Sequence, residues 1–597
     1  MAVTGFQITL RRPLAGGAPF GDAGSYEELK GRLHYAVDPT HAANRGVTDL
    51  ALAPRNGAGR VEFSADLSLL VPVDRARVSG RALVDVVASC GWQFDLPDVP
   101  GLIRLYGAQA REHGQPLCGR VYVQLQAPED VTDFLLSDRA HQAYPAADLD
   151  ERDATLTVRD MPDAEPEVIP RARWKFARVV NGRVTPDPHH VWLEDGFAKG
   201  RLYHLAYTGT GAQVVGLGLV ALRDCAAWLK GAEAPARARW VYAYGRSQTG
   251  RVLRTLIHYG LNEAEVGGDA FDGVIANVAG AMRGEFNQRF GQNSKDRPWT
   301  MCHLEPFQVE PRGRLKVMYT NTSAEYHRGD ASLIHTDPDG GRDVEHGQSV
   351  RVYHFAGTEH GLGIWPPADT QPAPADPHGW VERSQHVRGV VNYGRLLRAC
   401  LINLDRWVTE GIAPPPNRHP RIDDGTAVAP DALAKTFDAI PGAHYPRRHA
   451  RPRRQDFGAD AEMRRITLAP PRVGAPYGTH VSAVDGDGNE VAGIVLPEIT
   501  VPVATHTGWN LRHAEIGGVE QLLVFAGATL PFAKTRGERE RSGDPRPSIA
   551  ERYASRDDYL ARVRSAALSL VKERYLLEED VETSLAFAAR MWDAWAR

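Results

Sequence analysis

Hydrophobic and polar residues alternate along the first 90 residues of the chain. The alternation is clearest in four stretches that Gly, Pro and Asn-Gly turn signals separate: GFQITLRR, GRLHYAVD, RVEFSADLSLLVPV and ALVDVVASC. A period of two is typical of β-strands that have one buried face. We therefore expect a β-rich N-terminal segment over residues 1–60, packed on a core whose first strands follow it.

From about residue 200 the pattern changes to strands that alternate with helices. The expected strands are RLYHLAY, RWVYAYG, FDGVIANVAG, RLKVMYTNT and VRVYHFAG, and the expected helices are VVGLGLVALRDCAAWLKG, GRVLRTLIHYGL and HVRGVVNYGRLLRACLINLDRWVTEG. This alternation is typical of βαβ units and a mostly parallel sheet. The pattern thus predicts an α/β core over residues 60–415, with helices that flank the sheet.

Two further regions interrupt or follow the core. Residues 100–198 mix strand-like stretches with acidic and Pro-rich turns, and we interpret them as a β-rich insertion or lid. After three prolines at 414–416 the chain becomes basic and rich in proline, which indicates a linker. A hairpin around Gly-Asp-Gly-Asn and two helices, near 548–573 and 577–595, then complete a C-terminal extension that begins at residue 416 and ends at residue 597.

The composition restricts the class of protein and its partners. The chain has 597 residues, more than one hydrophobic core usually supports, and its 70 basic and 74 acidic residues leave a net charge of −4. This balance provides no electrostatic field for nucleic acid or for an anionic membrane. We therefore expect a small-molecule partner, and the sequence predicts no oligomeric state.

Cysteine usage and the N-terminus bear on the compartment. The five cysteines form no CxxC pair, which fits reduced thiols in a cytoplasm better than a disulfide framework. The first residues, MAVTGFQITLRRPLAGG, contain no apolar stretch of signal-peptide length. We expect a cytoplasmic protein, with secretion as the alternative if a leader peptide has been removed.

The segment ARWVYAYGRSQTGRVLRTLIHYG carries the main candidate for chemistry. An apolar strand leads into Gly245-Arg246-Ser247-Gln248-Thr249-Gly250, and a helical pattern begins at once. A serine between strand and helix is typical of a nucleophile in a strained turn, where the residues two positions away are small. Thr249 stands where the usual G-x-S-x-G motif has its second glycine. The alternative is a serine that only caps the helix.

Two loops after later strands supply partners for Ser247. Glu325 follows the strand RLKVMYTNT. His360 follows the strand VRVYHFAG, within the sequence Thr-Glu-His-Gly. An acyl-transfer triad needs a histidine base and an acid that orients it, and in α/β-hydrolases they come after the serine in the order acid, then histidine. We predict Ser247, Glu325 and His360 as the catalytic residues, with Asp330 and Asp343 as the rival acids.

Many segments, taken together, match a known family. They are YEELKGRLHYAVDP, GRVEFSADLSLLVPVD, CGWQFDLP, EDGFAKGRLYHLAY, YGRSQTGRVLR, FDGVIANVAGAMRGEFNQRFGQ, TNTSAEYHRGDASLIHTDPDG, GTEHG, AGIVLPEITVPVATHTGWNLR and GDPRPSIAERY. On these segments the chain resembles the bacterial "alpha/beta hydrolase domain" proteins, the Abhydrolase_10 group. The resemblance implies an α/β-hydrolase fold and an esterase-like activity through a covalent acyl-enzyme.

One part of the chain departs from that family at the loop expected to form the oxyanion hole. Relatives carry an Asn-Arg-Gly loop after the strand that matches ALVDV, whereas here ALVDV runs almost directly into VASCGWQFD. An oxyanion hole needs two N–H donors. We predict the backbone N–H of Gln248 as the first, and the N–H groups of Gly91 and Trp92 as the second. The alternative is that Gly91 and Trp92 end a strand packed in the core.

Other residues could line a substrate pocket or suggest other chemistry. Arg246 could contact a substrate carboxylate, and Trp299 and Trp365 could form pocket walls, although aromatic residues are more often part of the core. No metal or cofactor motif has the required spacing, so we expect neither a cofactor nor a metal. The sequence thus predicts a serine esterase or lactonase. The alternatives are an acyltransferase with the same residues and a non-catalytic small-molecule binding protein.

Overall fold

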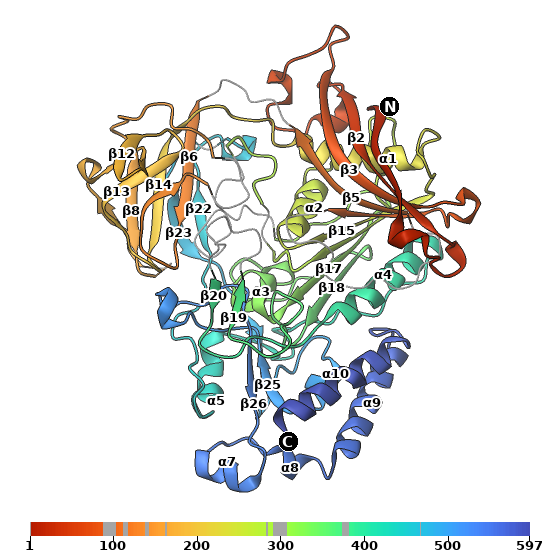
Figure 1. Ribbon diagram of the computed structural model, residues 1–597, viewed down its shortest axis with the longest axis vertical. Coiled ribbons are helices and arrows are strands. Elements are labelled where there is room, and N and C mark those ends of the chain that lie inside the picture. The colour runs from red at the N-terminus through yellow and green to blue at the C-terminus, as the bar shows by residue number, and fades with distance from the viewer. Residues whose placement is uncertain are drawn as a thin grey trace.

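A computed structural model describes residues 2–86, 103–111 (backbone), 118–137, 143–161, 164–281, 284–290, 307–372, 381–465 and 467–596. Its main feature within these residues is a nine-stranded sheet with the strand order β1-β2-β3-β5-β4-β15-β16-β17-β18 (Figure 1). The strands are β1 (Val3–Pro13), β2 (Tyr26–Val37), β3 (Val61–Pro72), β4 (Arg81–Val86), β5 (Ile103–Arg111), β15 (Trp240–Arg246), β16 (Gly273–Asn277), β17 (Lys316–Thr322) and β18 (Val350–Phe355).

The sheet has an antiparallel part and a parallel part. β1, β2 and β3 pair in antiparallel fashion, and β3 is also antiparallel to β5. From β5 onward, through β4, β15, β16, β17 and β18, each strand is parallel to the next one in the sheet. All five residues of β16 are buried, as expected for a parallel strand covered on both faces. The predicted α/β arrangement with a largely parallel sheet is therefore present.

Helices cover both faces of the parallel part. α1 (Leu217–Lys230) and α2 (Gln248–His258) bury Val220 and Leu256 against one face, in a cluster that also holds Val241 of β15. α4 (Gly394–Thr409) buries Leu404 against the other face, together with Tyr242. Alternate residues of β15 thus point into two separate hydrophobic layers.

A β-rich module, which consists of the strands from β6 to β14, lies to one side of the main sheet (Figure 1). It has its own hydrophobic core, which includes Trp174 and Leu205. Its strands are β6 (Gly119–Leu125), β7 (Val131–Leu135), β8 (Thr155–Arg159), β9 (Glu167–Ile169), β10 (Trp174–Lys175), β11 (Ala177–Val180), β12 (Arg183–Pro186), β13 (His190–Phe197) and β14 (Leu202–Gly209).

Two strands belong to other sheets than their sequence indicated. β14, the stretch RLYHLAY, pairs antiparallel with β6 and β8 in the β-rich module and not with the parallel sheet. β5 lies in the main sheet between β3 and β4, although its residues fall in the predicted insertion. Periodicity identifies a strand from local sequence, but its pairing partner is decided by distant segments.

The C-terminal extension packs on the core and on the β-rich module. The helices α9 (Arg556–Lys572) and α10 (Asp580–Trp595) join the hydrophobic cluster of α4, and Phe457 contacts Tyr122 of the module. The remaining elements are β19 (Thr370–Pro372), β20 (Val381–Arg383), β21 (Ala427–Val428), β22 (Arg453–Asp456), β23 (Arg472–Pro476), β24 (Val481–Ser482), β25 (Ala504–Thr507), β26 (Ala528–Pro531), α3 (Ser323–His327), α5 (Ala434–Asp438), α6 (Pro497–Thr500), α7 (Arg536–Ser542) and α8 (Ile549–Arg552). No helix in the described ranges is both long and apolar enough to cross a membrane.

Candidate active site

Ser247 occupies a sharp turn between the end of β15 and the start of α2. Its backbone has φ +56° and ψ −119°, a conformation that residues other than glycine rarely adopt. A Cβ atom on Gly245 would lie 2.5 Å from the carbonyl oxygen of Thr249, and one on Gly250 would lie 3.0 Å from that of Asn277. The turn therefore requires glycine at position 245 and leaves little room at position 250.

Thr249 closes the turn that the usual motif closes with glycine. Its hydroxyl accepts a hydrogen bond from the backbone N–H of Arg246 and donates one to the carbonyl of Arg246, at 2.9 and 3.0 Å. The backbone N–H of Ser247 donates to the carbonyl of Asn277 on the neighbouring strand β16. These bonds hold the strained Ser247 in place, so the turn is rigid although Thr249 replaces the second glycine of the usual motif.

The hydroxyl of Ser247 points at His360. Although Ser247 stands at the N-cap position of α2, its side chain makes no capping hydrogen bond within the described part of the chain. Its Oγ lies 2.9 Å from Nε2 of His360. The side chain is half-buried, so it is accessible from solvent. The geometry thus disfavours the capping interpretation of this serine.

His360 is held on several sides. Its Nδ1 lies 2.6 Å from Oε1 of Glu325. Its backbone N–H donates to the carbonyl of Phe525, whose ring packs against the imidazole with 4.3 Å between centroids. Its own carbonyl accepts hydrogen bonds from the guanidinium of Arg246 at 2.8 Å and from the hydroxyl of Tyr393 at 2.9 Å. These contacts fix the ring between Ser247 and Glu325.

Glu325 is fully buried in α3, directly after β17. Its second oxygen, Oε2, accepts hydrogen bonds from the backbone N–H and the hydroxyl of Thr322, at 2.8 and 2.6 Å, which forms a capping box. The rival acids have other partners: Asp330 pairs with Arg328, and Asp343 accepts backbone N–H bonds from 422 and 423. The structure thus brings Ser247, His360 and Glu325 together, which we call the Ser–His–Glu array.

Local charges set the protonation states of the array. Burial alone would raise the pKa of Glu325, but the charge of His360 and the hydrogen bond with it, with help from Arg328, lower that pKa to about 2. Burial, together with the charges of Arg246 and Arg328, lowers the pKa of His360 to about 4 in spite of Glu325. At neutral pH the array therefore contains an ionised Glu325 and a neutral His360, which can accept a proton.

Two residues predicted to line a substrate pocket have other contacts. Arg246 binds the backbone carbonyl of His360, as described above, so this contact assigns it to the support of the array. Trp365 packs against Phe587 and Trp595 of α10, with ring centroids 5.4 and 6.1 Å apart. The tryptophan belongs to the hydrophobic layer that α10 covers, a long-range contact that its local sequence did not indicate.

Of the predicted oxyanion donors, Gln248 lies within the described residues. Gln248 is the first residue of α2 and directly follows Ser247, which is the place from which α/β-hydrolases take one oxyanion donor. Gly91, Trp92 and Trp299 lie outside the described residues. The N–H of Gln248 therefore has the position expected for one donor, and the second donor stays a prediction.

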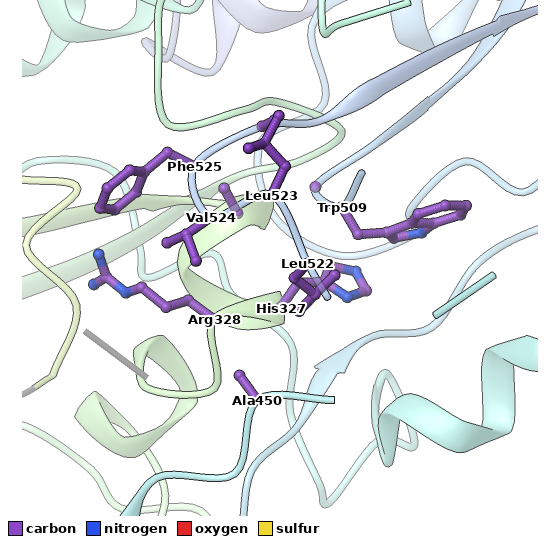
Figure 2. A pocket seen from close by; sticks show the side chains of 11 residues that line it. His327, Arg328, Ala450, Trp509, Leu522, Leu523, Val524 and Phe525 are labelled. Atoms are coloured by element: carbon purple, nitrogen blue, oxygen red, sulfur yellow. The ribbon is translucent and has the colours of Figure 1, made fainter. Parts of the chain in front are cut away.

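Figure 2 shows a small cavity beside α3, lined by side chains of α3 and of the loop that precedes β26. Its volume of about 10 Å³ gives room for about one water molecule. It is lined by Ala324, His327, Arg328, Ala450, Gly508, Trp509 and residues 522–526. The cavity is too small for an ester substrate, and Phe525, which lines it, also packs against the ring of His360.

Phe525, Tyr393 and Thr322 support the array but were not predicted from the sequence. Thr322 carries a local signal, because Thr-x-x-Glu is the spacing of a capping box. Phe525 and Tyr393 reach His360 from distant parts of the chain, and no local pattern marks them. For metal binding, the described residues contain no cluster of three or more His, Cys, Asp or Glu side chains arranged around one point.

The Ser–His–Glu array lies at the C-terminal ends of three parallel strands, which is the edge where α/β proteins bind ligands. The protein is therefore an α/β protein that has a candidate active site at the C-terminal edge of its sheet. A family model described as "Alpha/beta hydrolase domain" matches residues 198–586, and the chain belongs to this family. Family membership supports hydrolase activity.

Other comparisons add less. No curated protein matches the chain at a significant level. Among solved structures, a glucuronoyl esterase from Solibacter usitatus is similar over 59% of this chain and 80% of its own, with 13% sequence identity and a TM-score of 0.22. A TM-score this low does not establish a common fold.

Proposed function

We propose that the protein is a serine hydrolase that cleaves a carboxylic ester or lactone through an acyl-enzyme intermediate. The observation that carries the proposal is the unbroken hydrogen-bonded array, with 2.9 Å from Ser247 to His360 and 2.6 Å from His360 to Glu325. The strained and accessible Ser247 supports the role of nucleophile. We also propose that the nine strands form the central sheet of an α/β-hydrolase fold.

In the first half of the reaction, the Oγ of Ser247 attacks the substrate carbonyl carbon while Nε2 of His360 takes the serine proton. Glu325 accepts the hydrogen bond from Nδ1–H, which keeps the proton off Nε2 before the attack and stabilises the imidazolium afterwards. The tetrahedral intermediate then expels the alcohol, which receives the proton from His360. Ser247 is left esterified to the acyl group.

In the second half, water attacks the acyl-enzyme. His360 takes a proton from the water. The second tetrahedral intermediate then releases the carboxylic acid, while His360 returns the proton to Oγ of Ser247. Both intermediates carry an oxyanion, and the backbone N–H of Gln248 at the start of α2 is suited to bind it. The helix dipole of α2 adds a favourable field at that point.

A panel of p-nitrophenyl esters and lactones, assayed with the pure protein, tests this proposal. We expect turnover of at least one substrate, and loss of that turnover in Ser247→Ala. Assays with an added alcohol or amine distinguish hydrolysis from acyl transfer, because a transferase forms the new ester or amide in place of the acid. If no substrate of either kind is turned over, the protein is not the enzyme proposed.

A further inference from the structure

A second buried carboxylate, Glu490, lies close to the Ser–His–Glu array but does not belong to it. Glu490 stands in the C-terminal extension, after the turn that follows β24, and its side chain is almost fully buried. Its Oε2 accepts hydrogen bonds from the hydroxyl of Ser323 at 2.5 Å and from the backbone N–H of Gly357 at 2.9 Å. The same oxygen lies 2.8 Å from Nε2 of His354.

These contacts join the two segments that carry the acid and the base. Ser323 is the first residue of α3, two positions before Glu325, and Gly357 lies three positions before His360. The hydroxyl of Ser323 is also 2.8 Å from the N–H of Gly357, so the two segments and Glu490 meet at one point. A shift at this point would change the distance between Glu325 and His360 directly.

We propose that Glu490 is a positioning residue for the hydrolase proposed above, on which this inference rests. It fixes α3 against the loop after β18, and so sets the Glu325–His360 distance without contact with substrate. Small displacements in such an arrangement reduce the rate strongly, because a misplacement of about 1 Å costs on the order of a hundredfold.

A purely structural role explains the burial of Glu490 less well than a positioning role. A buried carboxylate loses its hydration, and apolar replacements of buried ion pairs are often neutral or stabilising. Another buried carboxylate in the extension allows a positioning role to be distinguished from a purely structural one. Glu498 is fully buried and pairs with Arg395 of α4, and its hydrogen bonds do not involve α3 or the loop after β18 in the described chain. It therefore serves as a matched control.

The experiment measures kcat and KM per active site, where active sites are counted by titration with a fluorophosphonate. Misfolded protein is not titrated, so a purely structural loss lowers the number of sites and leaves the kcat of each site unchanged. We expect Glu490→Ala to lower kcat by about tenfold to a hundredfold with little change in KM. Glu490→Gln, which keeps an acceptor oxygen, should retain more kcat than Glu490→Ala. Glu498→Ala should stay within about twofold of the wild type.

Failure of the positioning role and failure of the proposed hydrolase activity give different results. If the wild type is not titrated and has no turnover, the proposed function fails. If the wild type is active but Glu490→Ala keeps its kcat per site, or Glu498→Ala loses as much, the positioning role alone is wrong. Should Glu490→Ala yield no folded protein, Ser323→Ala decides: we expect a severalfold lower kcat at unchanged KM, and wild-type kcat would overturn the role.

Discussion

Nδ1 of His360 lies 2.6 Å from Oε1 of Glu325, although 35 positions separate the two residues in the chain. Each follows one of two adjacent parallel strands, β17 and β18, so the sheet brings the acid and the base to the same edge. This contact is the one by which we propose that the carboxylate orients the imidazole.

Glu325→Gln is expected to lower kcat by about 10⁴, because an amide cannot hold the imidazole in its working tautomer or stabilise the imidazolium. KM should change little, since Glu325 is fully buried behind His360. Steady-state kinetics measure both constants, and a circular dichroism spectrum checks the fold. A folded variant within tenfold of the wild-type kcat would contradict the role of Glu325.

The low pKa of His360 predicts activity that persists in acid. Because burial first, and then Arg246, lower that pKa to about 4, the acid limb of kcat/KM should have its midpoint well below the ordinary histidine value of 6.5. A pH–rate profile of the wild type measures the midpoint. A midpoint at or above pH 6.5 would show that His360 is not the residue that titrates, or that its environment differs from the one described.

The lowered pKa of His360 also makes the free energy of unfolding depend on pH. The unfolded chain protonates His360 near pH 6.5, whereas the folded chain does so near pH 4. The unfolded state thus binds more protons between these values, so this histidine's contribution is fully present above about pH 6.5 and is lost as the pH falls toward 4. Thermal midpoints of the wild type should fall over this window. In His360→Asn, the fall should be smaller.

Arg246 and Tyr393 both donate to the carbonyl of His360, but only Arg246 brings a charge. Arg246→Met should lower kcat and move the acid limb to higher pH, because the positive charge that disfavours the imidazolium is gone. Tyr393→Phe removes one hydrogen bond and should lower kcat without moving the acid limb. Equal pH profiles in the two variants would mean that the charge of Arg246 does not act on His360.

The tight turn around Ser247 predicts that a larger residue at position 245 destabilises the fold. Gly245→Ala places a Cβ about 2.5 Å from the carbonyl oxygen of Thr249, so it should destabilise the fold by about 1–3 kcal/mol and reduce activity. Gly218→Ala in α1 is the control, because its Cβ would meet nothing within 4 Å and alanine favours helix. Tm should fall in the first variant and stay level or rise in the second. A wild-type Tm and activity for Gly245→Ala would contradict the tight turn.

The sequence predicted the strands β15, β17 and β18, and the residues that follow them, because those signals are local. An apolar strand, a turn and a helical pattern mark Ser247, and glycine-flanked strand ends mark His360. Contacts made by Phe525 and Glu490 could not be predicted, since they depend on how the C-terminal extension packs against the core. The sheet to which β14 belongs was missed for the same reason: pairing is a long-range property.

Covalent labelling is the most direct test of Ser247 as the nucleophile. The wild type is treated with a fluorophosphonate, and mass spectrometry identifies the modified residue, with Ser247→Ala and His360→Asn as comparisons. We expect one adduct per chain on Ser247, none in Ser247→Ala, and much slower labelling in His360→Asn, which lacks the base. An adduct on another residue, or equal labelling of Ser247→Ala, would contradict this role of Ser247.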